Sequence, residues 1–424
     1  MRSGITPSGI RYGVKQSGRA VAYCALTIGC GTRNEAGYPA GIAHFVEHTL
    51  FRGTRRKSAA VIGSYLDRLG GELNAYTTKE EIVLHATVLK EDLGKAARLL
   101  FELAREATFP AGEIETERGV VLDEIISYKD NPAEDVYDCF ESLLFEGHPL
   151  ETPILGTKAS VKKITPAMLR RFVAEKFVPG AMVFTVVAPM EETRLEKTVI
   201  HLIDSIFTSG AAGVAGRDAV SGSSALLSVT ETAPLPAGAN KPFHKVIDKR
   251  NHEVNAVMGG TAPSLYQMPD RLVAAMLVNL LGGPASNSLL NKELREKRGW
   301  VYGIECSYTQ YADTGIVAIS FGCDKSNLDP CLAAIGRILA GLREKPLSPA
   351  RLRSYRRQLL GQLAVSGDAG EAQCLSMGKS LLSWSRIMPP EEVRAQLEAI
   401  TPEDLQKMAR IIFDPDHLST LIYL

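Results

Sequence analysis

Residues 41–51 read Gly-Ile-Ala-His-Phe-Val-Glu-His-Thr-Leu-Phe and contain the pattern His-x-x-Glu-His. On a helix, His44 and His48 lie one turn apart on the same face. Two imidazole nitrogens can then reach one tetrahedral ion at about 2.0–2.1 Å. Glu47 points toward the same ion, where it is better placed to take a proton from water than to act as a third ligand. The segment predicts a helix that carries a metal site.

The inverted order H-x-x-E-H is a zinc-peptidase motif, although so short a pattern also arises by chance. A catalytic zinc site takes a third protein ligand, and residues 113–124 (EIETERGVVLDE) offer candidates. Glu117 and Glu124 are seven residues apart and share one helical face. One carboxylate can bind the metal while the other orients a ligand histidine or the water network. The residues alone leave that choice open.

The alternative for this acidic run is a solvated helix face. The apolar residues around the two glutamates, from Val120 to Ile126, instead predict a substantially buried helix. A carboxylate pair in a buried helix needs a partner, and a metal ion would supply one.

The composition is that of an ordinary globular protein, with 424 residues, 45% apolar and 23% charged. Lys plus Arg equals Asp plus Glu at 48 each, so no basic excess supports a nucleic-acid or anionic-membrane partner. There is no apolar run long enough for a membrane helix. The seven cysteines include no CxxC pair and predict thiols in a reducing compartment. We expect a cytoplasmic protein, or a periplasmic one if the sequence begins after a removed segment.

Residues 208–240 are rich in Gly, Ala, Ser, Thr and Pro, which is typical of a linker. They separate a unit over 1–207, which holds the histidine motif, from a metal-free unit over 241–424. Both halves show the same coarse order of strands and helices, which indicates duplication of one unit. The expected strands are 20–32, 81–88, 255–262, 302–308 and 315–322. The expected helices are 44–51, 59–69, 89–106, 271–281, 287–298 and 328–342. The pattern predicts an α+β fold of two homologous sandwich-like units, each a mostly antiparallel sheet with helices on one face.

Three motifs in order, GIAHFVEHTLFRGT, LGGELNAYTTKEE and ETERGVVLDEI, resemble the pitrilysin/insulinase family of inverted-motif zinc peptidases. The likeness spans nearly the whole chain and is closest to the branch that includes the β subunit of mitochondrial processing peptidase and related bacterial peptidases. It implies one Zn²⁺ per chain, held by His44, His48 and Glu124. Glu47 is then the general base, and Glu117 matches the family's supporting second glutamate.

Residues 70–78 resemble the family's strand beside the metal, whose backbone pairs with an extended substrate. Asn74 and Ala75 are therefore expected substrate contacts. The physical reading agrees, because an edge strand offers unpaired N–H and C=O groups to a peptide. The alternative is a Gly-Gly turn into a core strand. His85, on the next strand, is expected to be a packed or partly exposed residue and not a ligand.

In the second half, residues 294–302 resemble the family's distal motif, in which an arginine and a tyrosine reach the substrate carbonyl. The matching residues are Arg295 and Tyr302, and both side chains can donate to a developing oxyanion. By sequence alone Arg295 is more typical of an exposed charge, and Arg298 is the alternative.

The resemblance also implies half of a clamshell, whose chamber needs four units and so a homodimer. A closed chamber admits short or unfolded peptides, so the expected function is that of a zinc-dependent endopeptidase. Two alternatives stay open. One is a non-catalytic structural subunit of this fold, and the other is a subunit active only with a metal-free partner chain.

Overall fold

The structure is a computed structural model that describes residues 1–209 and 235–424. The expected linker 208–240 falls largely outside the described residues. Contacts divide the chain into two compact units, and each contains a segment from the other half of the sequence. The first unit comprises Met1–Ile125, Thr152–Ser228 and Val365–Met388, and the second comprises Ile126–Glu151, Val229–Ala364 and Pro389–Leu424. The sequence analysis divides the chain differently, into duplicated units over 1–207 and 241–424. That division stays a prediction.

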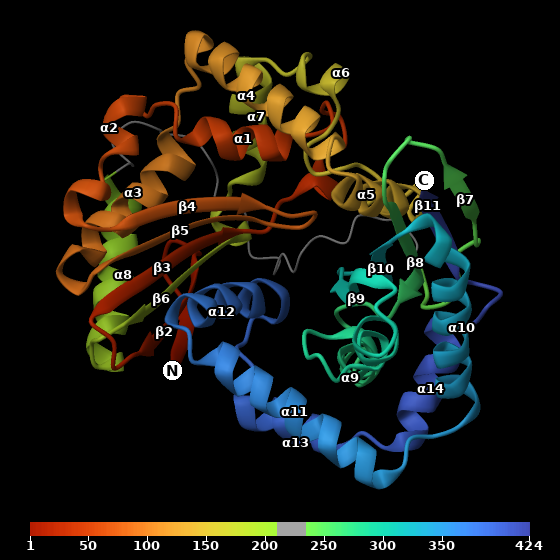
Figure 1. The fold of residues 1–424 in the computed structure, drawn as a ribbon. Coiled ribbons are helices and arrows are strands. Elements are labelled where there is room, and N and C mark those ends of the chain that lie inside the picture. Colours follow the sequence, from red (N-terminus) through yellow and green to blue (C-terminus); the bar gives the residue numbers. More distant parts are fainter. Residues whose placement is uncertain (210–234) are drawn as a thin grey trace. The chain divides into compact units, whose positions relative to one another are not determined.

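The first unit is built on a six-stranded sheet of order β1-β2-β6-β3-β5-β4 (Figure 1). Its strands are β1 (Arg2–Ile5), β2 (Arg11–Gln16), β3 (Val21–Ile28), β4 (Glu72–Thr77), β5 (Ile82–Leu89) and β6 (Met182–Ala188). Only the β2–β6 pair is parallel among these strands. At one edge β4 pairs with β5 alone, so the strand expected at 70–78 is an edge strand.

Both faces of the central strands of this sheet are buried. On one face Ala22, Cys24 and Leu26 of β3 join the core formed with α3 (Leu93–Glu106) and α8 (Glu192–Ser209). On the other face Ala25 packs with Cys374 of α12 (Gly370–Trp384), a helix from the C-terminal half. The sequence predicted helices on one face only. The second layer follows from the strands themselves, because β6 is apolar on both faces and buried throughout.

The second unit repeats this plan in a five-stranded sheet of order β7-β11-β8-β10-β9. Its strands are β7 (His244–Ile247), β8 (Val254–Ala262), β9 (Val301–Gln310), β10 (Gly315–Cys323) and β11 (Ser419–Tyr423). Here β7–β11 is the parallel pair. One face packs against α9 (Asp270–Gly282), α10 (Leu328–Glu344) and α14 (Pro402–Ile412). The other packs against α5 (Pro132–Leu144), which comes from the N-terminal half.

The strand order and the place of the parallel pair recur in the two sheets, with β1 as the one addition to the first. The α+β class of two similar units is thus confirmed. The remaining helices are α1 (Ile42–Leu50), α2 (Ala59–Gly63), α4 (Ala111–Lys129), α6 (Lys158–Val161), α7 (Pro166–Lys176), α11 (Pro349–Gly367) and α13 (Pro390–Ala399). Short 3₁₀ turns lie at Thr32–Asn34, Asp67–Leu69, Lys90–Asp92, Pro179–Ala181 and Lys325–Asn327, and a π-helix spans Asn291–Glu296.

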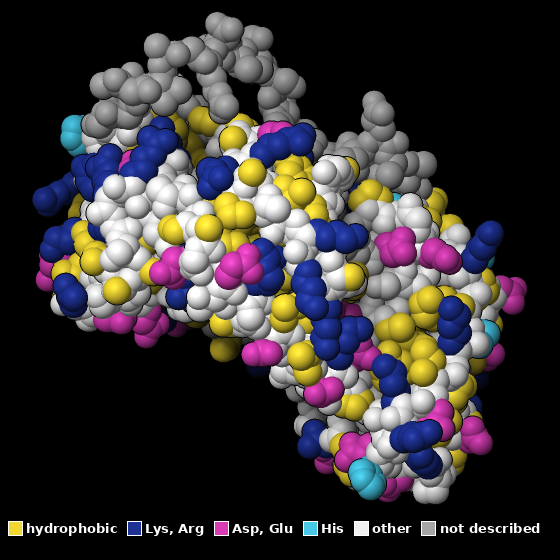
Figure 2. Space-filling model, turned by 90° about the horizontal axis from the view of Figure 1, so that it is seen from above, with side chains coloured by type: hydrophobic (Ala, Val, Ile, Leu, Met, Phe, Trp, Pro, Cys, Tyr) yellow, Lys and Arg dark blue, Asp and Glu magenta, His cyan; other side chains and the backbone are white. Residues whose placement is uncertain are grey.

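Two expected helices differ from those observed. The helix expected over 59–69 is α2 followed by a separate 3₁₀ turn before Gly70, whose φ of 67° lies in the left-handed region. The helix expected over 287–298 is largely the π-helix. All seven cysteines are free thiols. No helix in the described residues combines the length and the apolarity that a membrane crossing needs. Figure 2 shows basic, acidic and apolar side chains interspersed over the face that it draws.

Candidate metal centre

The helix α1 is held in place at its N-terminus by a buried carboxylate. Glu35 accepts hydrogen bonds from the backbone N–H groups of Gly41, at 2.9 Å, and Ala43, at 2.8 Å. These donors have no partner within the helix, so a carboxylate there stabilises it. Gly41 has a φ of 84°, and a Cβ there would lie 2.6 Å from the carbonyl oxygen of Leu155. Burial raises the pKa of Glu35 to about 8, against the two backbone hydrogen bonds, which lower it.

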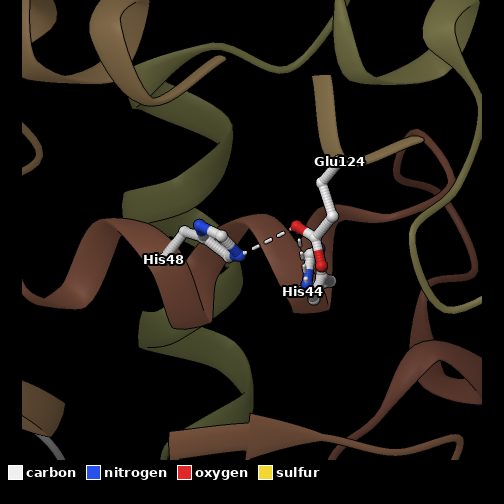
Figure 3. Close-up of side chains that lie close together, drawn as sticks. All are labelled: His44, His48 and Glu124. Atoms are coloured by element: carbon white, nitrogen blue, oxygen red, sulfur yellow. Dashed lines mark ion pairs between the residues drawn. The ribbon is translucent and has the colours of Figure 1, made fainter. Parts of the chain in front are cut away.

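The three expected ligands lie together. His44 and His48 project from α1, and Glu124 approaches from α4, with its carboxylate facing both rings (Figure 3). Glu124 Oε2 is 3.8 Å from His44 Nε2 and 3.4 Å from His48 Nε2. One ligand atom from each residue lies within 4.8 Å of the others. This is the side-chain set and the spacing of a three-ligand metal site.

The second glutamate of α4 contacts the far side of one ring. Glu117 Oε1 lies 2.9 Å from His48 Nδ1, and Glu117 Oε2 lies 2.5 Å from Arg52 Nε. A carboxylate at Nδ1 fixes the tautomer in which Nε2 carries the free lone pair. The sequence prediction did not include Arg52. It stands four residues after His48, just beyond the C-terminal end of α1, and this spacing is the one sequence signal that could have identified it.

Only part of α4 is buried, contrary to the expectation from its apolar residues. Val120 and Ile126 are 46% and 39% exposed. The buried residues are Ile114, Glu117, Val121 and Ile125. They recur at helical spacing, so the helix buries one stripe, and Glu117 belongs to it.

The electrostatics suit a cation between the three side chains. Burial, then the neighbouring His48, lowers the pKa of His44 to about 4, which keeps this ring neutral as a ligand must be. The ring of His48, whose Nε2 lies 3.4 Å from Oε2, lowers the pKa of Glu124, which stays anionic. Burial alone would lower the pKa of His48, but Glu124 and Glu117 raise it. Glu124 Oε2 is buried and has no hydrogen-bond donor among the described residues. The donor set therefore fits Zn²⁺.

Glu47 lies beside this cluster on the same helix. Its Oε2 accepts a hydrogen bond from Thr77 Oγ1 of β4 at 2.7 Å. Burial raises the pKa of Glu47, which makes the carboxylate a stronger base. The sequence prediction also did not include Thr77. It lies in the quoted NAYTT motif, but nothing local in the sequence connects it with Glu47, thirty residues away.

A groove of about 390 Å³ opens next to Glu47 and His48. It is lined by apolar and polar side chains in equal measure, and residues of β4 form part of it. The other lining residues are Phe51, Arg52, Ala59, Ile62, Gly63, Leu66, Asp67, Leu73, Asn74, Ala75 and Glu117. One ligand histidine, the carboxylate of Glu47 and the edge strand β4 thus line the same groove of the first unit.

The backbone of Ala75 faces the free edge of β4. The Thr78 N–H bonds to the carbonyl of Glu81 at 2.8 Å, so this is a hydrogen-bonded pair of the β4–β5 hairpin. Antiparallel pairs alternate between bonded and non-bonded. Ala75, opposite Leu84, is then a non-bonded residue whose N–H and C=O point away from β5, whereas those of Asn74 point toward it.

His85 is not part of the metal cluster. Its Nδ1 lies 3.0 Å from Glu371 Oε1 of α12, and its ring packs against Tyr76. It is therefore a packed residue, as the sequence indicated.

The expected donors of the distal motif belong to the other compact unit. Arg295 lies on the π-helix, is exposed and has no side-chain partner among the described residues. Arg298 instead bonds Glu293, with Nη2 2.8 Å from Oε1, and covers the ring of Trp300 at 4.6 Å. Tyr302 is 56% exposed, and its hydroxyl donates to Asp324 Oδ1 at 2.9 Å.

Comparison with known proteins agrees with this chemistry. Residues 14–158 match the family model of Insulinase (Peptidase family M16), and residues 163–359 match that of the Peptidase M16 inactive domain. The chain is 28% identical over 410 residues to an uncharacterized zinc protease of Bacillus subtilis, across 95% of this chain and 93% of that protein. An uncharacterized zinc protease of Streptomyces coelicolor is 27% identical over 385 residues, across 90% and 80% of the two chains.

Two solved structures share the fold at 19% identity. A protease from Helicobacter pylori superposes with a TM-score of 0.87 over 100% of this chain and 98% of its own. A peptidase M16 inactive domain from Pseudomonas fluorescens gives a TM-score of 0.84 over 100% and 97%. At this identity the likeness concerns the fold alone.

Proposed function

Because this chain belongs to the M16 (insulinase) family of peptidases, we propose that it is a zinc-dependent endopeptidase with its active site on the first unit. The observation that carries the proposal is the convergence of His44, His48 and Glu124 beside the carboxylate of Glu47. A structural subunit of the same fold would have no need of this complete set. One Zn²⁺ per chain is the expected cofactor.

In this proposal His44, His48 and Glu124 hold the ion, and Glu117 keeps the His48 ring in the correct tautomer. When bound, Zn²⁺ supplies Lewis-acid polarisation of the scissile carbonyl and lowers the pKa of water. Glu47 takes the proton from the attacking water and returns it to the leaving amine. The raised pKa of Glu47 suits both transfers, since the group must first accept the proton and then release it.

The edge strand β4 is proposed to align the substrate. An extended peptide that pairs with the outward N–H and C=O groups of Ala75 lies along the groove, next to Glu47. Asn74, exposed on the same strand, provides a polar side chain beside it. Backbone pairing of this kind needs an extended chain, so short or unfolded peptides are the proposed substrates.

Arg295 and Tyr302 are proposed to donate hydrogen bonds to the oxyanion that forms on the substrate. Two observations support this role. Arg295 is exposed without a side-chain partner in the described part of the chain, whereas Arg298, the alternative, is engaged with Glu293. Tyr302 is exposed, and a substrate oxyanion would take the place of Asp324 Oδ1 as the acceptor of its hydroxyl.

The proposed assembly is a homodimer whose four units enclose a chamber, and a metal-free partner chain is the alternative. The proposed location is the cytoplasm, which the seven free thiols support.

The test is digestion of a mixed peptide library, read by mass spectrometry, with parallel measurement of zinc content. We expect cleavage by the zinc-loaded protein, loss of cleavage with a chelator, and recovery when zinc is added back. Zinc binding without any cleavage by the isolated chain would contradict the proposal as stated. It would favour a non-catalytic role or a required partner, and size-exclusion chromatography with candidate partners would separate these two.

A further inference from the structure

A second groove, of about 700 Å³, is lined by residues of α11 and α13 in the second unit. Figure 1 shows the course of these two helices. This second groove shares no lining residue with the groove beside Glu47. Its lining is dominated by guanidinium groups. The lining residues are Arg353, Arg356, Arg357, Leu360, Gly361, Arg394 and Glu398.

Most of this positive charge is uncompensated. Arg394 is paired with the one acidic residue of the lining, since its Nε lies 2.9 Å from Glu398 Oε1. Arg353 and Arg357 have no ion pair or side-chain hydrogen bond within residues 1–209 and 235–424, and both are exposed. Arg356 donates from Nη2 to the carbonyl of Ile400 at 2.6 Å, a contact that fixes the side chain but does not neutralise it.

The arginines of α11 have an unfavourable energy in this structure that their contacts do not offset. Arg353, Arg356 and Arg357 stand at spacings of three and four on one helix, where like charges repel. The Nε of Arg356 is in addition buried with no acceptor among the described residues. A buried donor without an acceptor is destabilising. An anionic ligand in the groove would relieve the repulsion among the guanidinium groups.

From this arrangement we infer that the groove binds an oligophosphate of about three phosphate groups. Guanidinium groups pair with phosphate oxygens in a bidentate manner, which Lys does not match. The volume is in the range of small-ligand sites. Three uncompensated arginines balance the charge of a triphosphate better than that of a single phosphate.

The groove recognises the phosphates and not an attached base. Among its lining residues only Leu360 is a large apolar side chain, and none is aromatic. Binding of a nucleobase or of single-stranded nucleic acid uses aromatic platforms on which bases stack. Tripolyphosphate and the triphosphate of a nucleotide thus present the same chemistry to this site.

The test is isothermal titration of the full-length, zinc-free protein with tripolyphosphate, inorganic phosphate and ATP. Zinc is removed because tripolyphosphate binds it. We expect saturable 1:1 binding of tripolyphosphate, at least ten times tighter than binding of inorganic phosphate. ATP should bind within about threefold of tripolyphosphate. Because zinc is absent and no peptide is cleaved, the result is independent of the proposed peptidase activity.

The variant Arg353→Gln/Arg357→Gln should weaken tripolyphosphate binding at least tenfold, with an unchanged or higher Tm. Arg351→Gln is the matched control, since Arg351 is an exposed arginine of α11 outside the groove lining. If the control and the double variant lost tripolyphosphate affinity equally, the binding would come from the general positive charge of this surface and not from a defined site. Tighter binding of an oligoglutamate peptide than of tripolyphosphate would overturn the assignment to phosphate. ATP bound more than tenfold tighter than tripolyphosphate would show that a base is recognised.

Discussion

Glu117 and Glu124 face the same histidine pair from one helix, yet their surroundings give them different roles. The side chain of Glu117 is 3% exposed and contacts both His48 Nδ1 and Arg52. The side chain of Glu124 is 41% exposed, and its Oε2 lies near the Nε2 atoms of both histidines. The first geometry fixes a ring, and the second offers a lone pair to an ion.

This difference predicts opposite rankings in two measurements. Glu124→Ala should reduce zinc affinity more than Glu117→Ala does. We expect Glu117→Ala to lower the zinc affinity about 10–100-fold. In the zinc-free protein Glu117→Ala should instead be the more destabilising, by about 1–3 kcal/mol, because it leaves buried donors without an acceptor. Zinc titration and urea unfolding measure the two effects. If Glu117→Ala impaired zinc binding more, the ligand would be Glu117.

Glu47→Gln should abolish peptide cleavage while zinc content stays normal. The amide keeps the shape of the side chain but cannot accept the proton, and general bases contribute about 10²–10⁴ in rate. Turnover and bound zinc are measured on the same sample. Glu91→Gln, at an exposed position of the same unit, is the matched control. If the Glu47→Gln enzyme retained most of its activity, Glu47 would not be the general base.

Helical geometry allowed His44, Glu47 and His48 to be predicted together, because residues three and four apart share a face. The same geometry could not choose between Glu117 and Glu124, which share a face as well. The family resemblance made that choice. Thr77 could not be predicted, because its contact with Glu47 depends on how β4 packs against α1 and not on any local pattern.

At the scale of single elements, the edge strand β4 provides two adjacent residues whose backbones point in opposite directions. Proline lacks the N–H group, and strands tolerate it where that group faces away from the ladder. Ala75→Pro should lower kcat/KM at least tenfold while Tm and zinc content change little. Asn74→Pro removes an N–H directed at β5 and should lower Tm clearly.

Activity assays and thermal unfolding of the two proline variants provide the measurement, and each variant serves as the control for the other. Normal kcat/KM in a folded Ala75→Pro protein would mean that substrates do not pair with this edge.

Elements with strong periodicity were predicted well, among them β8, α3 and α10. The helices α5 and α12 were not predicted as partners of a sheet, because each packs on strands from the opposite half of the chain. Periodicity shows that a helix has a buried face but not which surface covers it. The π-helix also escaped prediction, since its residues have an ordinary helical pattern.

At the scale of the whole molecule, α12 makes the stability of the first sheet depend on the C-terminal half. Gly378 lies where α12 meets β3, and a Cβ there would be 2.5 Å from Thr27 Oγ1. Gly378→Leu should therefore destabilise the protein by about 1–3 kcal/mol through overpacking. Gly336→Leu in α10, where a Cβ meets nothing within 4 Å, should be neutral or stabilising. Equal Tm values for the two variants would show that α12 is not a tightly packed layer of this sheet.

The chamber hypothesis requires residues of the second half to act in catalysis although the metal ligands all belong to the first. Tyr302→Phe and Arg295→Ala should each reduce kcat by about 10²–10³, the cost of losing one oxyanion donor, with normal zinc content and unchanged Tm. Lys292→Ala, an exposed charge on the same π-helix, is the control. If Arg298→Ala lost activity while Arg295→Ala behaved like the control, the oxyanion donor would be Arg298 and not Arg295. If Tyr302→Phe and both arginine variants cleaved peptides at the control rate, the second half would be a scaffold, and an oxyanion site assembled from two units would be excluded.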